Sequence, residues 1–293
     1  MNHQKTLATI LTLAGSDPSG GAGVQADCKT IHALGGYALS VATALTAQNS
    51  QGVQAVYQVD PNVFAAQVDA LLADYQIDVL KIGMLGNADK VEQLSGILQQ
   101  IPVNTPIVLD PVLISSSGKT LLQNDAIAVL LEKVVPRVTV LTPNIPEAEF
   151  LLAQNDIEIE LNDLLSQQEF MAIAKALQQL KCDNILLKGG HGCGDQAIDY
   201  LFTELQSKPQ VHSFAQPRIQ VQHSHGTGCT LSSAIATKLA QGDSLEQAVA
   251  ASKDYLHQAL LQSATGQPHY RPLSEAKNEK SHRRGGLHHF FAK

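Results

Sequence analysis

The chain of 293 residues has no tryptophan, few charged residues and no long apolar run. A helix that crosses a membrane needs about 20 consecutive apolar residues, and no window of this sequence comes close to that length. Leu7–Ala14 is also too brief for the apolar core of a secretion signal. We therefore expect a globular protein of the cytoplasm, with no membrane partner.

Cysteine is scarce as well. The four cysteines, Cys28, Cys182, Cys193 and Cys229, lie far apart, without a CxxC pair and without the spacing of metal ligands. Together with the missing secretion signal, this pattern indicates free cytoplasmic thiols rather than a disulfide framework.

Positive charge is not in excess, because 27 acidic residues outnumber 20 basic ones and give a formal net charge of −7. Nothing in this balance predicts a nucleic-acid partner or an acidic membrane surface. The length, with 44% hydrophobic residues, suits one large α/β domain with a well-filled core, although two smaller domains are an alternative.

Short apolar runs alternate with longer helical patterns. The predicted strands are Thr9–Ala14, Leu39–Thr46, Val79–Ile82, Ile107–Leu109, Val138–Leu141 and Asn184–Leu187. The predicted helices are Gly23–Leu34, Pro61–Tyr75, Ala88–Gln100, Asp125–Lys133, Pro146–Ala153 and Ser166–Leu180. This rhythm favours a three-layer α/β/α fold, in which a mostly parallel sheet is covered by helices on both faces.

The last third of the chain departs from this alternation. Residues 197–221 have the pattern of two strands that form a hairpin or a sheet edge, and two helices, Thr227–Gln241 and Ser244–Ser263, follow. We find no internal repeat and no linker, so we predict a single domain over residues 1–264.

The C-terminal segment contains glycine, proline, serine and charges without a sustained period. We interpret residues 265–286 as a loop that precedes the terminal Leu287–Phe291. Residues 265–293 are thus expected to be a loop and a tail that packs on the same domain.

A glycine-rich loop, Gly15–Gly23, follows the first predicted strand. Gly21-Ala22-Gly23-x-x-Ala26 satisfies the GxGxxA dinucleotide pattern, but that fingerprint starts directly after the strand and requires an acidic residue about 20 positions later. Ser40–Asn49 contains no acid, and no Lys-Ser/Thr pair follows Gly20, so the phosphate-binding P-loop is also absent. The loop is either a turn that caps a helix or a close backbone approach to a flat ligand, with Asp27 facing the same cleft.

Two residues that follow the next strands suit an aromatic ligand. Gln48 offers both a donor and an acceptor, which can match the amino and ring-nitrogen edge of a pyrimidine. Met84 could contact the face of a ring. The plainer alternatives are a local hydrogen bond for Gln48 and a core position for Met84.

The next three strand ends carry groups that suit a polyphosphate and a metal ion. Asp110 follows Ile107–Leu109, Asn144 and Glu147 follow the next strand, and Lys188 follows Asn184–Leu187. Carboxylate and amide oxygens are ligands that suit Mg²⁺, and a lysine can reach phosphate oxygens. Taken singly, Glu147 could only favour a helix start and Lys188 could only be a solvated end.

The most distinctive local feature is Gly226-Thr227-Gly228-Cys229 at the start of a predicted helix. Glycines expose backbone N–H groups there, and the helix dipole favours an anion such as a phosphoryl group in transfer. A plain helix cap would also explain the glycines. It explains the cysteine less well, because a first-turn position lowers the pKa of a thiol.

Together these segments resemble the hydroxymethylpyrimidine/phosphomethylpyrimidine kinases of the ribokinase-like superfamily. The similar segments, which span roughly residues 7–263, are Ala14–Asp27, Thr46–Asn49, Lys81–Leu85, Asp110–Val112, Thr142–Glu147, Lys188–His191 and His225–Thr230. The resemblance implies a three-layer α/β/α domain, commonly a homodimer, that uses Mg²⁺ and ATP. It also implies two successive phosphoryl transfers, first to the hydroxymethyl group and then to the resulting phosphate.

The same resemblance implies a role for each site residue. Gln48 would bind the pyrimidine, in a pocket that is lined by Asp27, Gly15, Met84 and Val112. Asp110 and Glu147 would organise Mg²⁺, and Lys188 and Asn144 would contact ATP. The turn Gly226–Gly228 would form an anion hole, with Thr227 and Gly228 also on the nucleotide side and Cys229 beside the acceptor.

Two positions depart from the wider pattern. The superfamily usually has aspartate as general base where this chain has Cys229, as in the pyrimidine-kinase branch. Many relatives have lysine in the segment that matches Ser115–Gly118, where this chain has only hydroxyls and glycine, so one charge that could bind phosphate is missing.

Three other functions are alternatives. A pyridoxine or pyridoxal kinase acts on a similar flat ring that bears a hydroxymethyl group. A non-catalytic sensor could bind the pyrimidine without turnover. A dinucleotide dehydrogenase has only the GxGxxA match in its favour.

Overall fold

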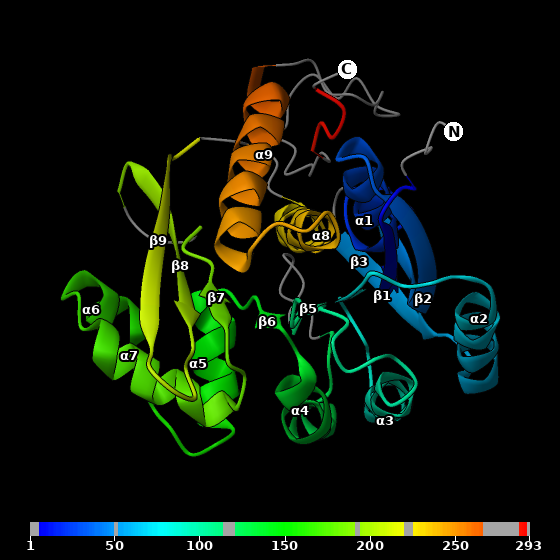
Figure 1. Cartoon of the computed structure of the whole chain (residues 1–293), viewed down its shortest axis with the longest axis horizontal. Helices are drawn as coiled ribbons and strands as arrows, with labels where there is room; N and C mark the ends of the chain where they lie inside the picture. Colours follow the sequence, from blue (N-terminus) through cyan, green and yellow to red (C-terminus); the bar gives the residue numbers. More distant parts are fainter. Residues whose placement is uncertain are drawn as a thin grey trace.

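The structure, a computed structural model, describes residues 6–49, 52–113, 121–190, 194–219, 225–265 and 287–291. A nine-stranded sheet with the order β3-β2-β1-β4-β5-β6-β7-β8-β9 runs through these residues (Figure 1). Its strands are β1 (Thr9–Ser16), β2 (Tyr37–Asn49), β3 (Gly52–Gln58), β4 (Val79–Ile82), β5 (Ile107–Leu109), β6 (Val140–Leu141), β7 (Ile185–Leu187), β8 (Gln196–Thr203) and β9 (Gln210–Pro217). The α-helices are α1 (Gly23–Ala33), α2 (Pro61–Asp74), α3 (Ala88–Leu98), α4 (Asn124–Val129), α5 (Ile145–Ala153), α6 (Leu161–Ser166), α7 (Phe170–Leu177), α8 (Thr227–Ala240) and α9 (Leu245–Thr265).

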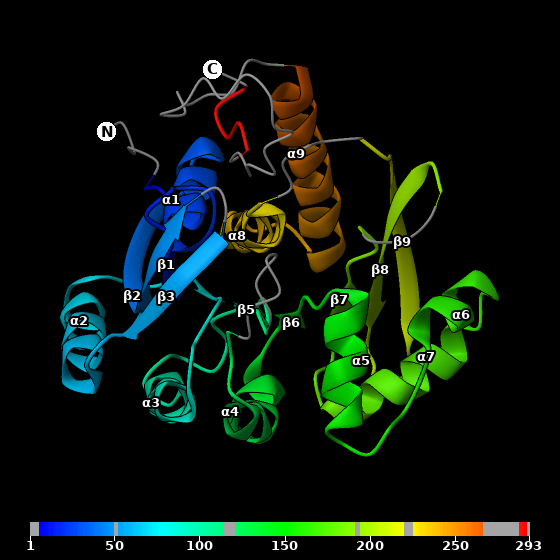
Figure 2. The same cartoon turned by 180° about the vertical axis from the view of Figure 1, so that it is seen from behind.

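Alternate strand residues enter two separate cores, because successive side chains of a strand point to opposite faces of the sheet. On β1, Leu11 and Leu13 join the core beneath α2, α3, α4, α5 and α7, whereas Ile10 joins the core that contains residues of α1, α8 and α9. Figures 1 and 2 show the sheet between these two groups of helices. The prediction of a three-layer α/β/α fold is confirmed.

The middle of the sheet is parallel and its edges are antiparallel. Strands β2, β1, β4, β5, β6 and β7 pair in parallel, while β3 pairs antiparallel with β2, and β8 pairs antiparallel with both β7 and β9. The predicted hairpin in residues 197–221 corresponds to β8 and β9, and its last two residues lie outside the described part. Strand β3 was not predicted, because its sequence alternates only weakly and it forms an exposed edge of the sheet.

Two predicted helices differ from the structure. The helix expected over Ser166–Leu180 begins only at Phe170, as α7: the preceding α6, which was not predicted, ends at Ser166, and Gln168 turns the chain with a φ of 60°. The helix expected over Asp125–Lys133 is α4 followed by a π-helical turn, Leu130–Val134, and a 3₁₀ turn, Val135–Arg137. A short 3₁₀ segment, Gln178–Leu180, directly follows α7.

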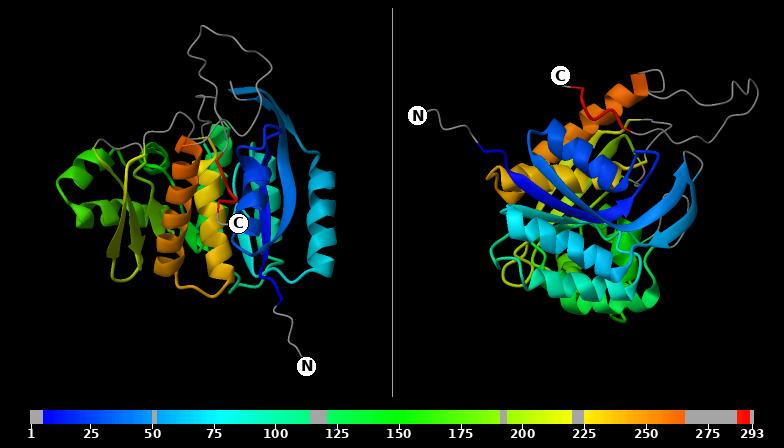
Figure 3. Two further views of the ribbon diagram at one scale, coloured as in Figure 1. Left: turned by 90° about the horizontal axis from the view of Figure 1, so that it is seen from above. Right: turned by 90° about the vertical axis from the view of Figure 1, so that its right-hand side faces the viewer.

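The carboxyl ends of the parallel strands meet at one edge of the sheet. Strand β2 is longer than its neighbour, since its last pairing with β1 joins Leu45 to Ser16 and the following residues pair with β3 only. The β2–β3 ribbon therefore extends past this edge (Figure 3). Ligands of open α/β sheets bind at this edge, near the point where the strand order reverses; here that point lies between β1 and β4.

The tail packs against α1 and α9. Leu287 and His289 are buried, the hydroxyl of Tyr255 donates to the His289 carbonyl oxygen at 2.8 Å, and Thr30 Oγ1 lies 3.2 Å from His289 Nδ1. Of the segment predicted to be a loop, only Thr265 is described, as the last residue of α9, and residues 266–286 lie outside the described part. Within the described helices, none combines the length and apolarity that a membrane span requires.

Candidate functional site

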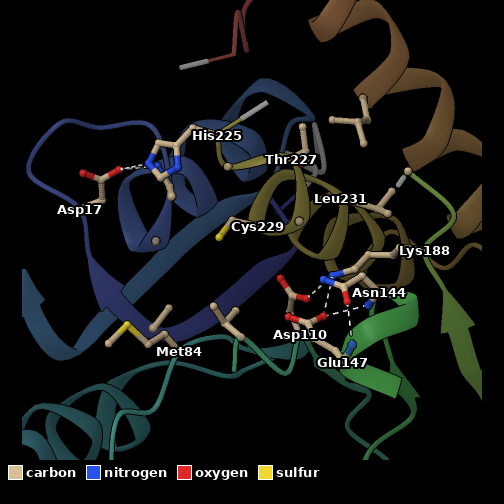
Figure 4. A pocket seen from close by; sticks show the side chains of 18 of the residues that line it. Asp17, Met84, Asp110, Asn144, Glu147, Lys188, His225, Thr227, Cys229 and Leu231 are labelled. Atoms are coloured by element: carbon tan, nitrogen blue, oxygen red, sulfur yellow. Dashed lines mark hydrogen bonds and ion pairs between the residues drawn. The ribbon is translucent and has the colours of Figure 1, made fainter. Parts of the chain in front are cut away.

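A cavity of about 770 Å³ lies at the carboxyl edge of the sheet. It brings together residues that are far apart in sequence, with a polar cluster at one end and the Asp17–His225 pair and Met84 at the other (Figure 4). The predicted site residues that line it are Gly15, Gln48, Met84, Asp110, Val112, Asn144, Glu147, Lys188, Gly226, Thr227, Gly228 and Cys229. Asp27 is the exception, and it is described below.

The polar end is built from the residues that follow three neighbouring parallel strands. Asp110 follows β5 and is buried, and its Oδ1 lies 2.6 Å from Nζ of Lys188, which follows β7. The same Nζ lies 3.9 Å from Oε2 of Glu147, beyond β6. Two acidic groups thus share one ammonium group at the end of the cavity.

Glu147 is part of this cluster and of a helix cap. Its Oε2 accepts the backbone N–H of Asn144 at 2.8 Å, and Asn144 Oδ1 accepts the backbone N–H of Glu147 at 2.8 Å, which forms a capping box at the start of α5. Burial raises the pKa of Glu147 to about 7, where the Lys188 ammonium opposes the shift and the Asp110 carboxylate adds to it. A divalent cation would favour the ionised form of this carboxyl and displace its proton.

The start of α8 packs closely against the Asp110–Lys188–Glu147 cluster. A Cβ on Gly228 would lie 3.1 Å from Asp110 Oδ2 and 3.4 Å from Lys188 Nζ. Gly226, at the N-cap, has a φ of 84°, and a Cβ there would lie 1.8 Å from the carbonyl oxygen of Gly21. Only glycine fits at Gly226, and its conformation lets α8 begin at this point. The positive end of this 14-residue helix faces the cavity directly beside the cluster.

Cys229 lies between the two ends of the cavity (Figure 4). Burial raises the pKa of its thiol to about 11, against the opposing effect of the Lys81 ammonium and of a backbone hydrogen bond from Gly23. The carboxylates of Asp27 and Asp110 raise the pKa as well. The lowered thiol pKa that was expected from the first-turn position is therefore wrong, because burial and two nearby carboxylates outweigh the helix start.

Asp27 does not line the cavity, and its predicted place in the substrate pocket is wrong. Its carboxylate is fully buried and accepts hydrogen bonds from Lys81 Nζ at 2.9 Å, from Thr12 Oγ1 at 2.6 Å and from Ser233 Oγ at 2.8 Å. Lys81 is itself fully buried, in β4. Asp27 faces inward from α1 because its counter-charge, the Lys81 ammonium group, is itself buried away from the cavity.

The other end of the cavity contains Gln48 and Met84. Gln48 stands on the overhanging part of β2, and Met84, after β4, is held by a hydrogen bond of 2.5 Å from Thr43 Oγ1 to its carbonyl oxygen. A Cβ on Gly15 would lie 2.9 Å from the sulfur of Met84, so glycine lets this side chain lie against β1. An amide beside a thioether and the apolar Val112 can accept a flat polar ring.

Several residues at the cavity were missed as single candidates. Asp17 Oδ2 lies 2.8 Å from His225 Nε2. Asp199 and Lys253 also line the cavity, and Asp199 Oδ2 lies 2.6 Å from Lys253 Nζ. Lys81 had a usable signal, since a lysine within an apolar strand requires a buried counter-charge. The partners Asp17 and Asp199 could not be found, because each pair joins residues that are distant in sequence.

Comparison with known proteins gives consistent results. A family model described as phosphomethylpyrimidine kinase matches residues 17–273. The hydroxymethylpyrimidine/phosphomethylpyrimidine kinase of Escherichia coli is 40% identical over 96% of this chain and 97% of its own length. The solved phosphomethylpyrimidine kinase of Clostridium difficile is 36% identical, with a TM-score of 0.70 over 87% of this chain and 99% of that one. A pyridoxal kinase from Staphylococcus aureus in complex with AMP-PCP and pyridoxal is 25% identical, with a TM-score of 0.78 over 97% of this chain and 94% of that one.

The position of Asp27 predicts a defect in stability. Removing one partner of a buried ion pair costs about 3–5 kcal/mol, so Asp27→Ala should lower the free energy of unfolding by that amount in urea titration. The exposed pair Glu92–Lys133, with a contact of 2.6 Å, is the matched control, and Glu92→Ala should cost about 0–1 kcal/mol. Replacing both partners, as Asp27→Leu with Lys81→Met, should recover most of the loss. An Asp27→Ala protein as stable as the control variant would contradict this assignment.

Proposed function

Because the chain belongs to the phosphomethylpyrimidine kinase family, we propose that it phosphorylates 4-amino-5-hydroxymethyl-2-methylpyrimidine and then its monophosphate, with ATP, in thiamine biosynthesis. One observation carries this proposal: a single cavity is lined by Gln48 and Met84 and by the Asp110–Lys188 pair. Cys229 lies between Met84 and that pair (Figure 4). A ring at the first end would direct its hydroxymethyl group toward the second.

The polar end suits a polyphosphate with Mg²⁺. No group of three or more His, Cys, Asp or Glu residues in the described part is placed to hold a metal alone, and Mg²⁺ characteristically takes one or two carboxylates and completes its shell with phosphate oxygens and water. Asp110 and Glu147 fit that requirement. When bound, the ion would neutralise negative charge on the phosphates.

The remaining polar groups of this end bind and orient. Lys188 would exchange its contact with Asp110 for a phosphate oxygen, and Asn144 would contact the nucleotide beside it. The N–H groups of Thr227 and Gly228 would receive the phosphoryl group in transfer, because the first turn of a helix directs its backbone N–H groups and the positive end of its dipole at an anion.

Cys229 would take the proton of the alcohol. Its thiol is protonated at neutral pH, since its pKa is about 11, so only the small thiolate fraction can accept a proton. The second acceptor, a phosphate monoester, is already largely ionised near pH 7 and needs no such base.

Phosphorylation of a vitamin B6 alcohol is a second candidate, because the pyridoxal kinases covering nearly the whole chain share its fold. Purified protein with Mg²⁺ and ATP should convert the aminopyrimidine alcohol to its monophosphate and diphosphate, as identified by mass spectrometry. Removal of Mg²⁺ with EDTA should abolish both products. Conversion of pyridoxine alone would replace the proposed substrate, and tight pyrimidine binding without ADP would indicate a sensor.

The pKa of Cys229 predicts a difference between the two steps in their pH dependence. Below the pKa of a base its active fraction rises about tenfold per pH unit, so kcat/KM for the alcohol should rise between pH 7 and 9 more steeply than that for the monophosphate. Cys229→Ala should remove this difference and slow the alcohol step far more, with Cys28→Ala as the control. Equal losses for both acceptors would exclude a base role for Cys229.

A homodimer is also expected, and the β2–β3 ribbon offers a surface for it. Leu45 and Tyr57 lie opposite each other in this ribbon and are 51% and 62% exposed. Large apolar side chains exposed side by side on an edge ribbon favour a protein contact. Sedimentation should show a dimer for the native chain and a monomer for Leu45→Glu with Tyr57→Lys. A native monomer at micromolar concentration would contradict the expectation.

A further inference from the structure

His225 connects the ring end of the cavity to the glycine-rich loop (Figure 4). Its Nε2 lies 2.8 Å from Asp17 Oδ2 and 3.0 Å from the side-chain nitrogen of Gln48. The amide oxygen of Gln48 lies 3.2 Å from Thr46 Oγ1, and this hydroxyl lies 2.9 Å from the carbonyl oxygen of Ser16. These contacts form one chain of polar groups from Asp17 to the Ser16 carbonyl, and the amide expected to bind the substrate lies in the middle of it.

The number of protons in this chain determines which group donates to which. The Thr46 hydroxyl has one proton, and its closer partner is the Ser16 carbonyl, which can only accept; the hydroxyl therefore presents a lone pair to Gln48. Asp17 can only accept as long as it is ionised. Burial opposes ionisation, but hydrogen bonds from His225 and Ser19 hold the pKa of Asp17 below its ordinary value. Nε2 of His225 must therefore carry a proton.

These two results assign the orientation of the Gln48 amide. With its nitrogen toward His225, the amide would set donor against donor there and acceptor against acceptor at Thr46. The oxygen and nitrogen of an amide have nearly the same shape, so the hydrogen-bond partners decide between the two orientations. A half-turn of the amide removes both conflicts: the oxygen shares the Nε2–H proton of His225 with Asp17 Oδ2 in a three-centre hydrogen bond, and the nitrogen donates to Thr46 Oγ1.

Contacts around Asp17 and His225 hold the histidine in place, so that it can fix the orientation of the Gln48 amide. Asp17 Oδ1 accepts from the N–H and hydroxyl of Ser19 at 2.8 and 2.7 Å, and Oδ2 accepts from the N–H of Ala22 at 2.9 Å and of Gly21 at 3.2 Å. A Cβ on Gly21 would lie 2.6 Å from His225 Cδ2, so the ring packs directly on this glycine. Both the carboxylate that fixes Nε2 and the surface beneath the ring are therefore constrained.

We infer that His225 is a positioning residue that determines substrate specificity. Held by Asp17, it fixes the orientation of the Gln48 amide, so that the amide oxygen and the amide nitrogen each have one defined position at the cavity. This inference rests on the proposed function. The second lone pair of the amide oxygen would accept from an exocyclic amine, and the second proton of the nitrogen would donate to the adjacent ring nitrogen. A pyridine alcohol that has a hydroxyl in place of this amine–nitrogen pair presents one oxygen instead of two adjacent atoms, and therefore cannot face the amide oxygen and nitrogen side by side.

The tautomer of His225 can be measured directly in the native protein. Long-range ¹H–¹⁵N correlation spectra of the ¹⁵N-labelled chain, assigned with His225→Gln, should show a proton on Nε2 at pH 7 to 8. A ring protonated only on Nδ1 would overturn the inference, because Nε2 would then accept from the Gln48 nitrogen.

Binding measurements test the effect on specificity. His225→Phe keeps a planar ring but loses the donor, so calorimetry should show about tenfold or more weaker binding of the aminopyrimidine alcohol, a smaller change for pyridoxine and an unchanged KM for ATP. His225→Gln should restore selectivity, since its side-chain nitrogen can also donate to both neighbours. Equal weakening of both ligands would overturn the inference, because that result indicates a general structural role.

A double-mutant cycle separates this inference from the proposed function. In the Gln48→Leu protein, His225→Phe should cause no further loss of pyrimidine affinity, because the histidine acts through the amide. A full additional loss would overturn the inference while leaving the kinase function intact. If the native protein neither binds nor phosphorylates the aminopyrimidine alcohol, the proposed function fails, whereas the Nε2 tautomer should still be observed.

Discussion

The carboxylate of Asp27 joins four elements at one buried point beneath the cavity. It belongs to α1 and bonds to Lys81 of β4, Thr12 of β1 and Ser233 of α8. Asp27 lies one helical turn beyond Gly23, and Ser233 lies one turn beyond Cys229, so α1 and α8 are connected at two successive levels. The upper level is the contact between Gly23 and the Cys229 thiol. A buried ion pair adds little net stability compared with apolar residues, but any arrangement that separates its partners is strongly disfavoured. The two helix starts that face the cavity are thereby fixed relative to each other.

The rest of the cavity follows from the direction of the strands. Asp110, Glu147 and Lys188 converge because β5, β6 and β7 are parallel and end at the same edge. The direction of the strands alone brings their charges close together, without an additional helix or loop. The ring end has a different origin, since Gln48 reaches the cavity on a ribbon that has left the parallel sheet, and Thr46 ties this ribbon to the end of β1.

The strongly periodic parts of the fold could be predicted from sequence. The bounds of β4 and β5 agree with the predicted ones, because each is a short buried run between clear turn signals, and the start of α8 agrees because Gly226 cannot continue a helix in its left-handed conformation. Strand β3 could not be predicted, since an exposed edge strand has no buried face to impose a strict alternation. The break between α6 and α7 depends on the backbone turn at Gln168, for which the sequence offers neither glycine nor proline.

For the site, sequence indicated which residues gather but not how each is surrounded. The placement of Asp27 failed because its counter-charge, Lys81, is 54 positions away, and the pKa of Cys229 failed because burial outweighs the local helix start. The glycine-rich loop suggested a ligand, but the N–H groups of Ser19, Gly21 and Ala22 in this loop already donate to the protein's own Asp17 carboxylate. Such facts depend on tertiary contacts that no local pattern records.

The overhanging end of β2 separates recognition from chemistry. Gln48, which would bind the ring, lies on the β2–β3 ribbon at the periphery. The groups that would bind phosphate follow the central strands or belong to α8. His225, next to Gly226, is the contact through which substitutions in this ribbon would reach the phosphate-binding groups. A scaffold divided in this way can exchange one vitamin precursor for another during evolution while the transfer machinery remains as it is.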